Sequence, residues 1–250
     1  MTETPTAGQA PEPTPGQASV PGGLVSSVVE LVHTGPVLLG AYTLAELTAV
    51  DAIVDFLEAR PSDEVMAEAV RSLAARQLLV TGSEPDQLQV QGDLGIAVAF
   101  QQRSQVVLDA RATGTEPGEP WRVLLLPQPE PICLMVRIDG LGIHELGLYQ
   151  MDEALQALID WLPRGSAADH DDSGNADKLL GESERSALVT VTRYTARGSA
   201  ETAGKSTDLI LVRHDGKLHV LSPAADDRNR LEPATLTGEG VTDTVRALLA

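Results

Sequence analysis

Val136-Arg137-Ile138-Asp139-Gly140 is the stretch from which the fold can be predicted, because a near copy of it follows later in the chain. The second copy is Val212-Arg213-His214-Asp215-Gly216, which shares four of five residues with the first at an offset of 76 positions. In both copies aliphatic residues lead towards Asp-Gly, a dipeptide that favours a tight turn between two antiparallel strands. Each copy therefore predicts a β-hairpin.

The same order of elements surrounds both copies: a strand, a loop, the strand that ends in Asp-Gly, a returning strand and a helix. In the first copy these are Trp121–Leu126, the Pro-rich loop Pro127–Pro131, Ile132–Ile138, Ile143–Leu148 and Met151–Trp161. In the second they are Ala187–Tyr194, the polar loop Arg197–Thr207, Leu209–Arg213, Lys217–Leu221 and Val241–Leu249. We predict an α+β fold with a central antiparallel sheet flanked by helices, in which two similar strand-rich units form a pseudo-twofold internal repeat. The alternative is that the chain contains two unrelated hairpins.

The N-terminal half has helix signals. Thr43 and Glu46 fit a capping box at the start of a helix that we expect to reach about Ala59. Ser62 is a suitable N-cap for a second helix that continues to about Leu78. The run Leu24–Val32 fits a strand or a short helix, and we expect a strand. Further expected elements are a short strand over Leu88–Val90, a helix over Gly92–Arg103 and an extended run over Val106–Ala110.

Composition divides the chain into four parts. Residues 1–22 are rich in Pro, Thr, Gly and Ala, which predicts a disordered tail. Residues 23–164 hold the helical N-terminal part and the first strand-rich unit. Residues 165–186 are expected to form an acidic linker, and residues 187–250 the second strand-rich unit.

The charge balance narrows the classes of partner. The 250 residues include 36 acidic and 18 basic side chains, which gives a net charge of −18. So negative a surface repels phosphate backbones and anionic lipids, so we expect neither nucleic acid nor a membrane as partner. Aromatic residues make up only 3% of the chain, so stacking platforms are scarce. With no signal peptide and no apolar run long enough for a membrane helix, we expect a soluble, cytoplasmic protein.

The sequence contains no pattern typical of a catalytic centre. Cys133 lies in an apolar run, so we expect a buried thiol. There is no Gly-x-Ser-x-Gly elbow. Gly140-Leu141-Gly142 lies between two strands, where a dinucleotide loop does not occur. Asp152 and Glu153 are explained by the dipole at a helix start. We therefore predict a protein that is not an enzyme, with no catalytic and no cofactor-binding residue.

Two segments resemble metal sites but lack essential ligands. The segment Asp169–Asp177 has the alternating oxygen side chains of a calcium loop, but Leu180 occupies the twelfth position, where that loop needs a Glu. His214 and His219 flank the second Asp-Gly turn and could face each other across the hairpin, but only Asp215 is near enough to be a third ligand. We predict no metal site.

The two helices before residue 80, followed by a short strand pair, also resemble a winged-helix unit. The expected recognition helix carries Asp63, Glu64 and Glu68 against Arg71 and Arg76, a balance that is unfavourable for DNA. A transcriptional regulator with a winged helix and a C-terminal sensing unit is the alternative function.

The order of elements resembles the EspG family, the cytosolic secretion chaperones of actinobacterial type VII (ESX) systems. The likeness spans about residues 24–250 and includes the helical segment Ala67–Leu79, a helix near Leu94–Gln101 and a strand-rich unit closed by Met151–Pro163. The resemblance implies a central antiparallel sheet with pseudo-twofold symmetry. It also implies an adaptor that binds the exposed hydrophobic tip of a PE–PPE-like helical substrate pair, keeps it soluble and helps to deliver it for secretion. It assigns no site residue, but such an adaptor needs a surface that a partner covers, and the loops Pro127–Pro131 and Arg197–Thr207 are the first segments to test.

Overall fold

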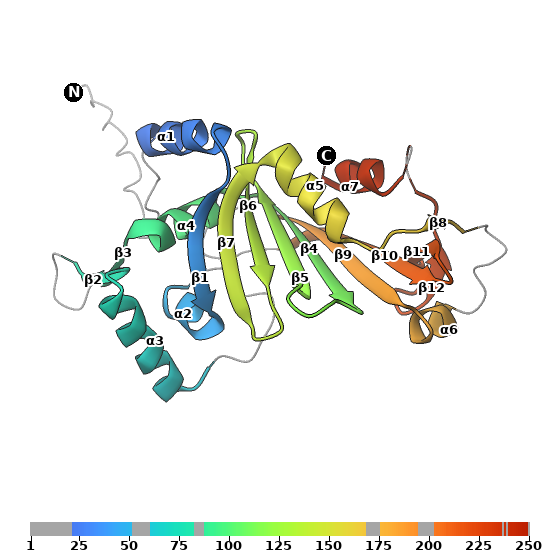
Figure 1. Ribbon diagram of the computed structural model, residues 1–250, viewed down its shortest axis with the longest axis horizontal. Coiled ribbons are helices and arrows are strands. Elements are labelled where there is room, and N and C mark those ends of the chain that lie inside the picture. The colour runs from blue at the N-terminus through green and yellow to red at the C-terminus, as the bar shows by residue number, and fades with distance from the viewer. Residues whose placement is uncertain are drawn as a thin grey trace, which may run out of the picture.

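The computed structural model describes residues 22–51, 61–82, 88–168, 176–194, 203–236, 238 and 240–249. Its main feature is one sheet of ten strands, in the order β1-β7-β6-β5-β4-β9-β10-β11-β12, with β8 pairing beside β11 (Figure 1). All neighbouring strands on the main path are antiparallel, whereas the pairing of β8 with β11 is parallel. The prediction of an α+β fold with a large antiparallel sheet flanked by helices is confirmed.

The strands of the main sheet are β1 (Val37–Thr43), β4 (Val106–Thr113), β5 (Arg122–Pro127), β6 (Ile132–Ile138), β7 (Ile143–Gln150), β8 (Ser166–Ala167), β9 (Arg185–Tyr194), β10 (Ala203–His214), β11 (Lys217–Pro223) and β12 (Leu231–Pro233). A separate hairpin consists of β2 (Leu79–Thr81) and β3 (Leu88–Val90). The helices are α1 (Gly22–His33), α2 (Leu44–Ala49), α3 (Asp63–Ala75), α4 (Gly92–Arg103), α5 (Met151–Trp161), α6 (Ala176–Gly181) and α7 (Val241–Leu249).

Helices cover the two faces of the sheet in separate groups. On one face, α1 to α4 and the β2–β3 hairpin form a core with β1 and β4 to β7 that includes Leu47, Leu73 and Phe100. On the other face, α5 and α7 form a second core with β4 to β6 and β9 to β11. At the far end of the sheet, α6 packs through Leu179 against Val212 and Leu221.

The predicted pseudo-twofold repeat is not confirmed. Both hairpin units are present, but their strands are ordered outward from β4 on opposite sides, and β5 and β9 run in the same direction because each is antiparallel to β4. A twofold axis perpendicular to the sheet would reverse one unit, and an axis along the strands would place α5 and α7 on opposite faces. Both helices instead pack in one core and are joined by an Arg246–Asp152 hydrogen bond of 3.1 Å. The shared order of elements therefore does not confirm a twofold repeat.

The two Asp-Gly turns occupy matching places but differ in conformation. Asp215 and Gly216 both have positive φ, 50° and 71°, as a two-residue type I′ turn requires. The first turn spans residues 139–142, and Asp139 Oδ1 accepts hydrogen bonds of 2.9 Å from the N–H groups of Leu141 and Ile143. There the positive φ falls on Gly142 instead of Gly140.

Two predictions for the N-terminal half need correction. The run Leu24–Val32, expected to be a strand, is part of helix α1, because its buried residues Val25, Val28 and Val32 are three and four positions apart and face the core together. The capping box of Thr43 and Glu46 is confirmed, but α2 ends at Ala49, shortly before Asp51, whose φ of 54° is not helical. Residues 52–60 lie outside the described residues.

The expected tail and linker are described only in part. Residues 1–21 of the tail lie outside the described residues, and Gly22 begins α1. Within the expected linker, residues 169–175 are likewise outside, but β8, α6 and the first residues of β9 form regular structure. The expected loop Arg197–Thr207 is also shorter, because residues 203–207 belong to β10.

Candidate functional site

One part of the sheet lies beside α5 without a helix in front of it (Figure 1). Cross-strand pairing places Leu38 of β1 opposite Gly147 of β7, and Gly147 opposite Met135 of β6, so these three residues face the same side as α5. On this side Leu38 is 73% exposed. We call the surface formed by the exposed residues Leu38, Ala41, Glu145 and Arg137 the open sheet face.

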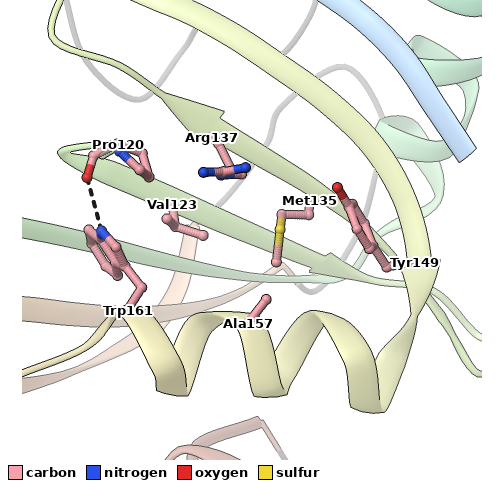
Figure 2. A pocket seen from close by; sticks show the side chains of 7 residues that line it. All are labelled: Pro120, Val123, Met135, Arg137, Tyr149, Ala157 and Trp161. Atoms are coloured by element: carbon pink, nitrogen blue, oxygen red, sulfur yellow. Dashed lines mark hydrogen bonds between the residues drawn. The ribbon is translucent and has the colours of Figure 1, made fainter. Parts of the chain in front are cut away.

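A pocket lies where the open sheet face meets α5 (Figure 2). Its volume is about 290 Å³, and we call it the α5 pocket. It is lined by Pro120, Val123, Met135, Arg137, Tyr149, Ala157 and Trp161. Carbon surface dominates this lining, and the polar exceptions are one guanidinium, one phenol and the indole N–H.

A glycine shapes one wall of the α5 pocket. Gly147 and Tyr149 are two positions apart on β7, so they share a face, and the Tyr149 ring leans over Gly147. A Cβ atom at Gly147 would lie 2.9 Å from Tyr149 Cε2, which is closer than carbon atoms approach each other. Only glycine at position 147 therefore lets the ring adopt this position. Burial raises the pKa of Tyr149, whereas the charge of Arg137 lowers it.

The opposite wall is held in place by hydrogen bonds. Trp161 Nε1 donates a hydrogen bond of 2.9 Å to the carbonyl of Pro120, as Figure 2 shows. Arg185 lies with its guanidinium 5.7 Å from the Trp161 ring centroid and donates to the Trp161 carbonyl at 2.7 Å. Its Nη1 also donates to Glu119 at 2.7 Å. Because the indole N–H is already bonded, Trp161 presents its apolar ring to the pocket.

Arg137 is the cation of the α5 pocket, and it is only weakly engaged within the chain. Its side chain is 46% exposed and lies 3.8 Å from Glu145, which is 62% exposed. An exposed ion pair at this distance contributes little to stability. The guanidinium is therefore available to another carboxylate.

Cys133 lies on the same face as Met135 but is fully buried, as predicted. Burial raises the pKa of its thiol to about 12, so the thiolate that a nucleophile needs is not formed near neutral pH.

The Pro127–Pro131 loop is one of the two loops expected from the sequence to contact a partner. It borders a second cavity of about 490 Å³. The cavity is lined by His33, Gln128, Pro129, Glu130, Pro131, Gln150, Met151 and Asp152. Hydrogen bonds hold this loop in place. Gln128 Nε2 donates to the carbonyls of Phe100 and Leu126, both at 3.0 Å, and Arg103 donates to the Glu130 carboxylate at 2.6 Å. The other loop expected to contact a partner is Arg197–Thr207, and residues 195–202 lie outside the described residues.

The two histidines of the second hairpin, His214 and His219, lie near each other. His219 pairs across the hairpin with Val212, and His214 with Lys217, so the two rings are diagonal neighbours with centroids 6.4 Å apart. Within the described ranges, no group of three or more His, Cys, Asp or Glu side chains is arranged to hold a metal ion. The calcium-like segment falls mostly on residues 169–175, which are not described, and Leu180 belongs to α6.

A buried charge cluster at the centre of the sheet was not found by sequence reasoning. Arg122 on β5 donates two hydrogen bonds to Asp109 on β4, at 2.7 and 2.8 Å, and its side chain is 1% exposed. Arg111 bonds the same carboxylate at 2.7 Å from a 40% exposed position. Because Asp109 is opposite Leu124 and Arg111 is opposite Arg122, the cluster depends on the β4–β5 register.

The region that resembles a winged helix is part of the main core. Leu73 of α3 and Leu79 of β2 pack in the same cluster as the sheet strands. Arg71 bonds Glu68 at 2.6 Å, and Arg76, the C-cap residue of α3, bonds Glu46 at 3.1 Å. Both arginines therefore face carboxylates of the chain itself.

No family model matches the chain, and no match was found among curated proteins. Among the described residues, no helix has both the length and the apolar character that a membrane span requires.

Proposed function

We propose that this protein is a non-enzymatic, cytoplasmic adaptor that binds the apolar end of a PE–PPE-like helical pair, as a type VII secretion chaperone does. The open sheet face beside α5 is the observation that carries the proposal. It offers an exposed leucine at one side, an apolar pocket at the other and the charged pair Arg137–Glu145 between them.

This pattern suits an amphipathic helix. An apolar pocket that accepts one anchoring side chain is the usual centre of a protein interface, and charged residues around it fix orientation more than they add affinity. Leu38 adds a second apolar contact, because it lies on β1 across β7 from Met135. The resemblance to the EspG family supplies the class of partner.

The alternative, a winged-helix transcriptional regulator, has less support. A DNA-binding helix needs cations directed to phosphates, whereas Arg71 and Arg76 bond carboxylates of this chain. Helices α2 and α3 also share a hydrophobic core with the sheet, which does not favour a separate DNA-binding domain.

The test is co-purification with a PE–PPE pair expressed in the same cells, with the amount of complex measured by size-exclusion chromatography. We expect Leu38→Lys to weaken binding about tenfold or more, because it removes the burial of one leucine side chain. Leu188→Lys is the matched control, since Leu188 is a partly exposed leucine on the opposite face of the sheet. Failure of every PE–PPE pair to co-elute with the wild-type chain, or equal losses for both variants, would contradict the proposal.

A further inference from the structure

We propose that the α5 pocket is a binding site for an apolar group that carries a carboxylate, with the carboxylate at Arg137 and Tyr149 and the apolar part against α5. This inference concerns the ligand of the pocket and does not depend on the adaptor role.

The Arg137 guanidinium and the Tyr149 hydroxyl both lie on the side of the pocket away from α5 (Figure 2). The Tyr149 hydroxyl oxygen lies 3.4 Å from the Cβ position of Gly147, so the phenol extends along β7 towards the row that contains Glu145 and Arg137. A planar guanidinium offers a carboxylate two parallel hydrogen bonds, and a neighbouring hydroxyl adds a third donor. The resident partner, Glu145, is exposed and 3.8 Å away, so a ligand carboxylate displaces it at small cost.

The rest of the pocket favours hydrocarbon. Val123 and Met135 come from the strands, and Ala157 and Trp161 come from α5 (Figure 2). Met135 adapts its shape readily to an apolar ligand, and the Trp161 ring provides a flat wall. A volume of about 290 Å³ is at the lower end for ligand sites, which suits a short apolar chain or one aromatic ring.

The negative net charge of the chain makes a preference for an acid over its neutral analogue a specific sign of a local cationic site. With a net charge of −18, the chain repels anions at long range. An acid that binds better than its neutral analogue therefore reports a local cationic site and not general attraction.

The test is titration of the full chain with 4-phenylbutyrate, 4-phenyl-1-butanol and 4-phenylbutylamine, followed by NMR or calorimetry. We expect the acid to bind about tenfold more tightly than the alcohol, because a charge-assisted contact is gained, and the amine to bind most weakly. Equal affinities for acid and alcohol, or no measurable binding of the acid, would overturn the proposal.

Variants locate the binding. Arg137→Gln should remove the preference for the acid. Arg213→Gln should leave it unchanged, because Arg213 holds the matching place in the second hairpin, is also 46% exposed and bonds Glu184 at 2.9 Å. Ala157→Phe should block all three compounds, since Ala157 lies on the exposed side of α5 and lines the pocket. Thermal unfolding checks that each variant is folded. An acid preference that persists in Arg137→Gln, or that is lost equally in Arg213→Gln, would place binding elsewhere.

The same chemistry can come from a free acid or from the C-terminal residue of a partner chain. Acetyl-Gly-Phe with a free carboxylate and the same peptide with an amide end distinguish these sources. Tighter binding of the free-acid peptide than of phenylbutyrate assigns the site to a C-terminus, and the reverse order assigns it to a small acid. Both orders support the proposal, whereas equal binding of the peptide acid and the peptide amide contradicts it. If acid binding fails but PE–PPE pairs still co-elute with the chain, only this inference is lost.

Discussion

Replacing Asp109 with alanine should destabilise the protein more than any other single change in the charge cluster of the sheet. The substitution leaves the Arg122 guanidinium, 1% exposed, without its two hydrogen bonds of 2.7 and 2.8 Å. Removing one partner of a buried ion pair typically costs about 3–5 kcal/mol. For a chain of this size that loss corresponds to a fall in Tm of about 6–20 °C. Arg111 adds little to the cost, because at 40% exposure it can turn to water.

The assay is thermal unfolding followed by circular dichroism, with Asp208→Ala as the matched control. Asp208 accepts a hydrogen bond of 2.8 Å from Thr190 on the neighbouring strand, so its loss should cost about 1 kcal/mol. The double replacement of Asp109 and Arg122 by leucine should be less harmful than Asp109→Ala alone, because no charge is then left buried. Equal falls in Tm for Asp109→Ala and Asp208→Ala would show that the buried ion pair contributes no more than an ordinary hydrogen bond.

Three further predictions concern single sites. Burial alone would raise the pKa of Glu46, but hydrogen bonds from Thr43 and Ser72 and the charge of Arg76 lower it below the ordinary 4.5. The contribution of ionised Glu46 to the free energy of unfolding is therefore complete above about pH 4.5 and is lost as the pH falls through the lowered pKa. In urea unfolding, the difference in stability between wild type and Glu46→Gln should therefore shrink on acidification. A difference that stays constant with pH would contradict this. Cys133 should resist disulfide reagents until the chain unfolds, and fast labelling of the native protein would show that the thiol is accessible. Gly216→Ala should cost about 1–2 kcal/mol because φ is 71°, whereas Gly140→Ala should cost much less; equal urea midpoints for the two variants would be inconsistent with the two turn conformations.

Elements with strong local signals were predicted within a few residues. Strand β6 coincides with Ile132–Ile138, and helices α5 and α7 coincide with Met151–Trp161 and Val241–Leu249. Asp139-Gly140 marks the end of β6, and Pro163 marks the end of α5. For α7, the spacing of the apolar residues fits only a helix. Helix α1 was missed because Leu24–Val32 is aliphatic at both strand and helix spacing, and only packing against the sheet decides between them.

The site could not be predicted because it depends on contacts between distant segments. Leu38 and Arg137 belong to one surface only because β1 pairs with β7 and β7 with β6. The same holds for Asp109 and Arg122, which are partners only in the observed β4–β5 register. A local signal for the pocket did exist, in the alternation of Gly147 and Tyr149 on one strand face, but it has meaning only once α5 is placed beside it.

Hydrogen exchange of the chain with and without a bound PE–PPE pair tests whether the open sheet face is the binding surface. We expect slower exchange in β1, β6, β7 and α5, the elements that border the open sheet face, with little change in α3 and the β2–β3 hairpin. Protection confined to α3 and that hairpin, or to the opposite face around β9, would show that the partner does not bind the open sheet face.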